Sequence, residues 1–165
     1  FNGLGDSYDS LREYQKAIEC FTKSLEIYIK KDESSEDVAD TLNSLGNAYY
    51  AIKDHEKSLD CFTRSLKIYR KINSNISGTS EMEIADTLGN TGKLKYLLGN
   101  KQEAFNDLEE SLQLYKRLHK NPHHEDIEDT LKNLSDLAKM IDSPKADEYL
   151  KQYESIVNNR KGGKI

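Results

Sequence analysis

The chain has 165 residues, of which 36% are hydrophobic and 32% are charged, and its formal net charge is −5. Its length suits one structural unit, and so small an apolar fraction favours a thin helical architecture over a deep core. The acidic balance argues against a general nucleic-acid or anionic-membrane surface. No apolar run approaches the roughly 20 residues that span a bilayer, and no signal peptide precedes the first pattern. We therefore expect a cytoplasmic protein that binds neither nucleic acid nor membrane.

The first stretch of the chain, Phe1 to Tyr28, is repeated almost in full from Leu42 to Tyr69. The pattern is already under way at the first residue, which is not a methionine, so we expect a fragment of a longer protein. The matching positions lie 41 residues apart: Leu4 and Leu45, Gly5 and Gly46, Tyr8 and Tyr49, Phe21 and Phe62, Tyr28 and Tyr69.

Apolar residues within each copy recur at the spacing of a helix face. In the second copy Leu42, Leu45 and Tyr49 follow the i, i+3, i+7 pattern, and Leu59 and Phe62 resume it after the polar turn KDHEK. Each copy is therefore predicted to be a hairpin of two helices.

Two further copies complete the chain. Laying VADTL (38–42) on IADTL (84–88) reveals a third copy, and a fourth begins at Ile127 with a one-residue deletion near Ser143. We predict repeats at about 1–32, 35–72, 80–118 and 124–157, followed by a disordered tail at 158–165.

The links between copies are polar, unequal in length and rich in helix-start signals. Ser80 with Glu83 matches a capping box, and Asn121-Pro122 places a proline where the missing N–H costs little. Cys20 and Cys61 stand one repeat apart, too far for a disulfide between stacked helices, so we expect two buried free thiols.

These repeated residues resemble the tetratricopeptide repeat, whose pattern is L-G-x-x-Y in the first helix and A-x-x-x-F in the second. The second copy supplies Leu45-Gly46, Tyr49, Ser58 and Phe62. The glycine and the small residue facing it would let the two helices approach closely.

Later copies depart from this pattern. Thr91 and Lys95 replace Leu and Tyr in the third copy, and Ser135 and Ala138 replace Gly and Tyr in the fourth, which suits a terminal unit. The copies are also longer than the basic repeat, and with their A-D-T-L-N-S-L-G start they resemble the extended repeats of kinesin light chains and of cell-polarity adaptors.

The resemblance implies an all-α, right-handed solenoid of about four hairpins whose first helices line a concave groove. It also implies a non-enzymatic scaffold that binds a partner's peptide or short helix there, as part of a larger cytoplasmic adaptor. By repeat position, the groove residues are Asp6, Asp9, Asp40, Asn43, Asn47, Tyr50, Asp86, Asn90, Lys93, Tyr96, Lys132, Asn133, Asp136 and Lys139.

Two sets among these residues have alternative interpretations. The amides of Asn43, Asn47, Asn90 and Asn133 either form a ladder that matches a peptide backbone or are ordinary solvated side chains. Asp40, Asp86 and Asp129, each followed by Thr-Leu, either attract basic residues of a partner or stabilise helix N-termini. Lys93, Lys132 and Lys139 add basic character toward the C-terminal half.

Other site classes find little support in the sequence. The carboxylate clamp of chaperone-binding relatives needs a lysine where Asn2 stands, and Asp6 would repel the carboxylate. His119, His123 and His124 lie with Glu125 and Asp126 and could in principle hold a metal, but the adjacent pair of histidines lacks the i, i+4 spacing that presents two ligands to one ion. We expect no metal, no cofactor and no catalytic residues.

Two alternatives to the scaffold remain open. The first is a regulatory peptide sensor whose superhelix changes shape when its ligand binds. The second is a structural spacer that self-associates through its exposed terminal repeats.

Overall fold

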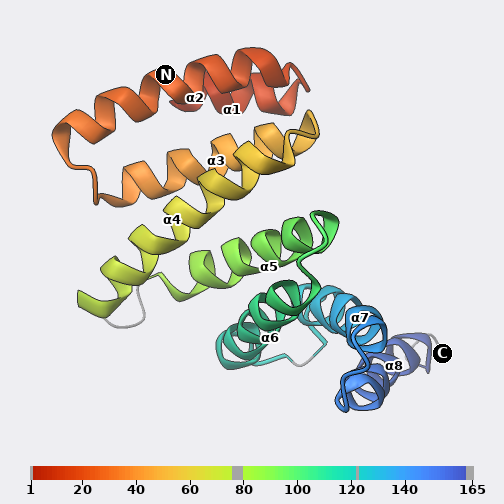
Figure 1. Ribbon diagram of the computed structural model, residues 1–165. Helices are drawn as coiled ribbons and strands as arrows, with labels where there is room; N and C mark the ends of the chain where they lie inside the picture. Colours follow the sequence, from red (N-terminus) through yellow and green to blue (C-terminus); the bar gives the residue numbers. More distant parts are fainter. Residues whose placement is uncertain (1, 76–79, 122, 163–165) are drawn as a thin grey trace.

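The computed structural model describes residues 2–75, 80–121 and 123–162, which form helices and, within those ranges, no strand (Figure 1). The all-α prediction is confirmed. The helices are α1 (Asn2–Ser10), α2 (Tyr14–Lys31), α3 (Glu36–Ala51), α4 (His55–Asn75), α5 (Glu81–Leu97), α6 (Lys101–Leu118), α7 (Glu125–Met140) and α8 (Ala146–Gly162).

Successive helices form four antiparallel hairpins that stack in chain order into a solenoid (Figure 1). Each helix packs mainly against its neighbours in sequence, as expected of a repeat protein. The buried side chains form two clusters, toward the two ends of the stack, and Ile68 of α4 packs against both. Among the described helices, none is long and apolar enough to cross a membrane.

Two predicted boundaries need correction. α4 continues to Asn75, beyond the predicted end at 72. α8 continues to Gly162, so the first five residues of the predicted disordered tail are helical, and 163–165 lie outside the described residues. The polar composition of these segments misled the prediction, because a helix with one wet face can continue past its last buried residue.

Of the helix-start signals, Ser80 does stand at a helix start as predicted, but without the capping box. Ser80 is the N-cap residue of α5, but its buried hydroxyl makes no hydrogen bond, so there is no capping box. α7 begins only at Glu125, and its N-cap is His124. Pro122 lies outside the described residues.

Close contact between the two helices of a hairpin depends on the repeated glycine. A Cβ on Gly46 would lie 2.9 Å from the Phe62 ring, and a Cβ on Gly92 would lie 2.8 Å from Leu108. The hydroxyl of Ser58 donates to the Gly46 carbonyl at 2.7 Å, which also requires a short distance between the helices. The predicted role of the glycine and of the small residue facing it is confirmed.

The third hairpin replaces part of this apolar contact by polar bonds. Thr91 donates to Asp107 Oδ2 at 2.8 Å, and Lys95 Nζ lies 2.8 Å from the same oxygen. The corresponding residues of the second hairpin are Leu45, Tyr49 and Cys61. Thr91 and Lys95, which depart from the pattern, therefore share a third departing residue, Asp107, as their partner.

Both cysteines are free and buried, as predicted. Burial raises the pKa of the Cys61 thiol to about 11, so it remains protonated at neutral pH.

Replacing Gly46 by Ala is expected to destabilise the protein by about 1 to 3 kcal/mol, because the added methyl group overpacks a filled contact. Gly89→Ala is the matched control, since a Cβ there would meet only Ser111 Oγ, at 3.6 Å. That change should stabilise α5 by up to about 1 kcal/mol through helix propensity. Urea unfolding of both variants and the wild type measures the change in free energy of unfolding. If the urea midpoint of Gly46→Ala is not lower than that of the wild type, the tight contact is contradicted.

Candidate functional site

The first helices of the last three hairpins (α3, α5 and α7), with Leu108 and Tyr115 of α6, line two adjoining pockets, which we call the groove. The apolar pocket has a volume of about 500 Å³ and is lined by Tyr50, Lys93, Tyr96, Leu97, Leu108, Asn133, Asp136, Leu137, Lys139 and Met140. The polar pocket has a volume of about 270 Å³ and is lined by Asn43, Asn47, Asp86, Gly89, Asn90, Lys93, Leu108, Tyr115, Asp126, Asp129 and Thr130. Lys93 and Leu108 belong to both.

Ten of the predicted groove residues line these two pockets, and all fourteen lie outside the buried core. Asp6, Asp9, Asp40 and Lys132 line neither pocket. Sequence reasoning missed the apolar walls, Leu97, Leu137 and Met140, because they lie at other positions of the repeat. Met140 and Leu97 are both 52% exposed, which singles them out once the fold is known.

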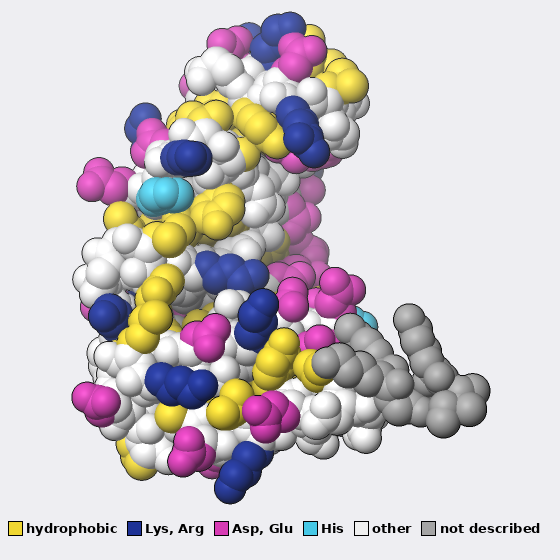
Figure 2. All heavy atoms as spheres, turned by 90° about the vertical axis from the view of Figure 1, so that its right-hand side faces the viewer, with side chains coloured by type: hydrophobic (Ala, Val, Ile, Leu, Met, Phe, Trp, Pro, Cys, Tyr) yellow, Lys and Arg dark blue, Asp and Glu magenta, His cyan; other side chains and the backbone are white. Residues whose placement is uncertain are grey.

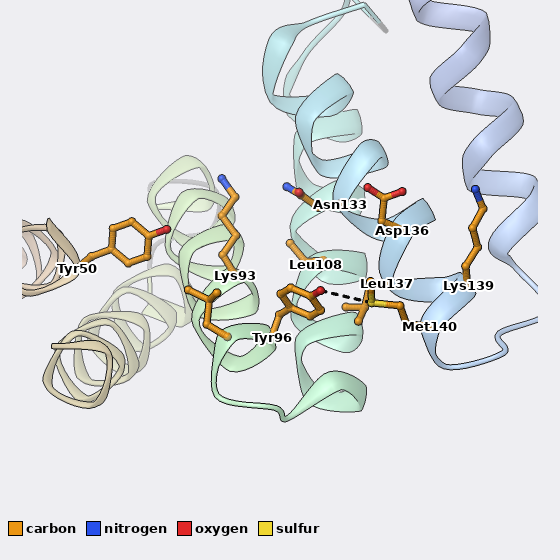
Figure 3. Close-up of a pocket in the computed structure, with 10 residues that line it drawn as sticks. Tyr50, Lys93, Tyr96, Leu108, Asn133, Asp136, Leu137, Lys139 and Met140 are labelled. Carbon is orange, nitrogen blue, oxygen red and sulfur yellow. Dashed lines mark hydrogen bonds between the residues drawn. The ribbon is translucent and has the colours of Figure 1, made fainter. Parts of the chain in front are cut away.

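The apolar pocket has hydrophobic walls and a polar rim. Leu108 and Leu137 are buried, and Figure 3 shows the polar ends of Lys93, Asn133 and Asp136 along one side of the pocket, which is its polar rim. Tyr96 lies across from this rim, and its hydroxyl donates to Met140 Sδ at 3.4 Å. An exposed pocket of this composition can take an apolar side chain of a ligand and orient its polar neighbours.

Hydrophobic side chains continue beyond the pocket. Figure 2 looks onto the side of the molecule where most hairpins turn, and it shows hydrophobic side chains from top to bottom with lysines and arginines between them. Leu11, Ile52 and Leu98 occupy equivalent positions in the first three turns and are all exposed.

The polar pocket presents amides that the protein itself leaves unused. Among the described residues, the side-chain amides of Asn43, Asn47 and Asn90 in this pocket form no hydrogen bond with another group, and neither does that of Asn133 in the apolar pocket. The Oδ1 atom of Asn43 is buried as well as unpaired. A buried amide oxygen without a partner is costly, so a ligand N–H there is favourable.

The row of aspartates has an internal role that neither interpretation anticipated. The Tyr69 hydroxyl donates to Asp40 Oδ1 at 2.5 Å, and the Tyr115 hydroxyl donates to Asp86 Oδ1 at 2.6 Å. Burial, and then the bond to the carboxylate, raise the pKa of both tyrosines above the ordinary value of 10.0. Two of these carboxylates thus join the helices of their own hairpins.

The sequence does contain a signal for these bonds. In the second and third copies, the aspartate of A-D-T-L and a tyrosine toward the end of the second helix are separated by 29 residues. The fourth copy has Asn158 at that distance from Asp129, so the pairing is not repeated there.

The charge of the groove differs between the two pockets. The polar pocket contains Asp86, Asp126 and Asp129 with Lys93, whereas the apolar pocket contains Lys93 and Lys139 with Asp136. The charge therefore changes from the polar pocket to the apolar one, and the basic character expected toward the C-terminal half stays a prediction. Such an arrangement can set the direction of a charged ligand.

The histidines fall into separate settings. His55 packs beside Tyr50, with ring centroids 5.7 Å apart. His123 is exposed, whereas His119 and His124 both contact Asp126. In the sequence, the adjacent pair His123 and His124 speaks against a metal site. In the structure, His124 lies instead beside His119.

Comparisons with known proteins concern both the sequence and the fold. Two family models described as tetratricopeptide repeat match residues 1–71 and 84–126. A search among curated protein sequences gave no match. The structure of BtubC (BKLC) from P. vanneervenii has a TM-score of 0.82 and 23% identity, over 98% of this chain and 63% of that chain.

Two other solved structures are similar. A putative kinesin light chain from Podospora anserina with nearly identical TPR-like repeats has a TM-score of 0.77 and 16% identity, over 98% of this chain and 74% of that one. The apo form of RapI has a TM-score of 0.79 and 18% identity, over 98% of this chain and 56% of the RapI chain. At these identities the likeness concerns the fold, and it agrees with the resemblance to kinesin light chain repeats.

The Tyr–Asp bonds predict how stability depends on alkaline pH. Because the folded-state pKa values are raised, the folded protein keeps these protons when the unfolded chain loses them. Below pH 10 these two tyrosines should therefore leave the free energy of unfolding unchanged. Above pH 10 they should lower it, by at most about 1.4 kcal/mol per pH unit for each tyrosine. Urea unfolding at a series of pH values measures this slope.

Variants test the assignment of the slope. Tyr69→Phe with Tyr115→Phe should reduce the alkaline slope and, below pH 10, cost about 1 to 3 kcal/mol for each lost bond to a carboxylate. The double variant should keep part of the alkaline slope, because burial and Glu109 also raise the pKa of Tyr149. Tyr50→Phe, at an exposed tyrosine outside these bonds, is the control, and an unaltered slope in the double variant would refute the assignment.

Proposed function

Because the chain belongs to the tetratricopeptide repeat family, we propose that it is a protein-interaction scaffold that binds a partner's peptide or short helix in the groove of its first helices. The observation that carries the proposal is the set of unpaired amides in the polar pocket, directly beside an exposed apolar pocket. The proposal includes no catalytic step.

The amides suit recognition of a peptide backbone. A primary amide donates and accepts at once, so it can pair with both the C=O and the N–H of an extended chain whatever its side chains. Asn43 and Asn47 come from α3, and Asn90 comes from α5, so the amides of two stacked hairpins line one pocket. A peptide bound there would contact more than one repeat.

The apolar pocket would select among the side chains of the ligand. Its volume of about 500 Å³ accommodates a large apolar side chain between Tyr50, Tyr96 and Met140. Lys93 and Lys139 would pair with an acidic residue beside this anchor, whereas Asp129 of the polar pocket would pair with a basic residue. We infer a ligand segment with an apolar anchor, a basic flank over the polar pocket and an acidic flank on the other side.

A role within a larger protein is suggested by the share of related structures that the chain covers and by its resemblance to kinesin light chain repeats. The chain spans 63% of the BtubC chain and 56% of the RapI chain. We propose that it serves within a larger cytoplasmic adaptor, as its resemblance to kinesin light chain repeats implies.

The test is selection of binding peptides from a random phage-displayed library, followed by measured affinities for the wild type and variants. Asn47→Ala with Asn90→Ala should weaken binding about 5- to 100-fold, because each lost hydrogen bond contributes about 0.5 to 1.5 kcal/mol. Tyr96→Ala should weaken binding of peptides that carry the apolar anchor. The melting temperature of the asparagine variant should not fall, because these amides make no internal bonds.

The matched control is Asn106→Ala. Asn106 is exposed on α6, pairs with Gln102 and lines neither pocket, so its loss should leave peptide affinity unchanged. Equal affinity of the groove variant and this control would exclude the groove. Small-angle scattering with and without the selected peptide separates a static scaffold from the sensor alternative, which requires a change in radius of gyration.

A further inference from the structure

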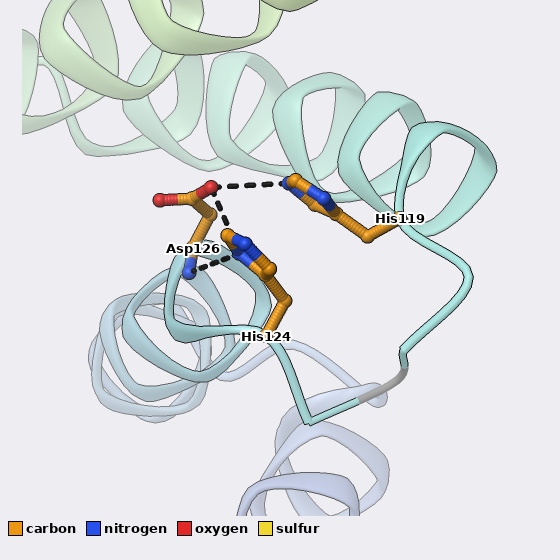
Figure 4. A group of neighbouring side chains, drawn as sticks. All are labelled: His119, His124 and Asp126. Carbon is orange, nitrogen blue, oxygen red and sulfur yellow. Dashed lines mark hydrogen bonds and ion pairs between the residues drawn. The ribbon is translucent and has the colours of Figure 1, made fainter.

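The end of α6 and the start of α7 bring together two imidazoles and a carboxylate (Figure 4). His119 directly follows α6, His124 directly precedes α7, and Asp126 is the second residue of α7. Nε2 of His119 lies 3.1 Å from Asp126 Oδ2, and Nδ1 of His124 lies 3.0 Å from the same oxygen. The three atoms all lie within 4.8 Å of one another, so three potential metal ligands converge.

Neighbouring groups hold this cluster in place. The His119 side chain is only 15% exposed, and its ring stacks on Tyr115 with centroids 5.8 Å apart. The Tyr115 hydroxyl is in turn fixed by its bond to Asp86. Such support around a ligating side chain raises metal affinity by orienting its lone pair in advance.

The carboxylate oxygen Oδ2 of Asp126 lies close to a nitrogen of each ring. Nδ1 of His124 also accepts the backbone N–H of Asp126, but this bond is long, at 3.5 Å, and the nitrogen has a single lone pair. A cation bound beside Oδ2 would take over that lone pair and neutralise the charge of the carboxylate.

We propose that His119, His124 and Asp126 bind one divalent transition-metal ion, of which zinc is the representative. Imidazole nitrogen with carboxylate oxygen is a donor set that suits zinc, and three protein ligands leave a position for water or another group. Because the ligands flank the link between α6 and α7, the ion clamps the third hairpin to the fourth.

Binding requires a small rearrangement and two neutral imidazoles. The rings of His119 and His124 are stacked, 3.6 Å apart and inclined by 7°. An ion lies close to the plane of each ligating ring, so the more exposed His124 ring must tilt out of the stack. Metal also competes with protons for the imidazoles, so the affinity for metal falls as the pH is lowered.

The site adjoins the groove, because Asp126 also lines the polar pocket. A bound ion therefore places positive charge among Asp86, Asp126 and Asp129 at the acidic end of the groove. The metal site rests on its own three ligands and stands whether or not the groove binds a peptide.

The experiment is calorimetric titration of the tag-free chain with zinc chloride at pH 7.5, repeated at pH 5.5, together with visible absorption spectra of added cobalt(II). We expect one zinc per chain, a rise in melting temperature at saturating zinc and affinity at least tenfold weaker at pH 5.5. His119→Ala and the isosteric Asp126→Asn should each weaken binding at least tenfold and abolish the shift in melting temperature. Circular dichroism without zinc shows whether each variant is folded.

His123→Ala is the matched control, since this histidine is exposed in the same link and makes no contact with Asp126. It should bind zinc as the wild type does. The proposal is overturned if zinc does not bind saturably, or if Asp126→Asn binds it undiminished. It is equally overturned if His123→Ala loses as much affinity as His119→Ala, which would indicate loose binding by loop histidines.

Discussion

The contact between a first-helix glycine and a large second-helix side chain determines the geometry on which the rest of the structure depends. Gly46 beneath Phe62 and Gly92 beneath Leu108 leave no room for a methyl group, so the two helices lie close enough for Ser58 to bond the Gly46 carbonyl. Hairpins built in this way have nearly the same shape and stack with their first helices in register (Figure 1). Polar residues at equivalent positions are thereby brought into one groove.

The internal bonds of the hairpins determine which groove groups remain for a ligand. Tyr69 and Tyr115 occupy one carboxylate oxygen each of Asp40 and Asp86, so these acids already stabilise the solenoid. The asparagine amides have no such partners among the described residues. In the proposed complex, neutral amides would recognise a backbone without regard to its sequence, so specificity would depend on the adjoining apolar pocket and on the charges on its rim.

Much of the fold was predictable because the repeat encodes it locally. Matching of the repeats located all four hairpins, the spacing of apolar residues identified their helices, and the glycines identified the close contacts. The same repeat positions located ten of the groove residues, but they could not reveal Met140 and Leu97, whose exposure depends on stacking. The Tyr–Asp bonds and the pairing of His119 with His124 join positions 29 and 5 residues apart, spacings that belong to no single helix face.

The third hairpin shows why departures from a repeat pattern must be interpreted together. Taken singly, Lys95 in place of a tyrosine and Thr91 in place of a leucine place polar groups in a tight interface, which is costly without partners. Asp107, which replaces a cysteine, accepts from Thr91 and pairs with Lys95, so the set satisfies itself. Because removing Asp107 would take the shared partner from both Thr91 and Lys95, the three substitutions depend on one another. A repeat protein can therefore change the chemistry inside a hairpin without changing its shape, and each hairpin keeps its place in the stack.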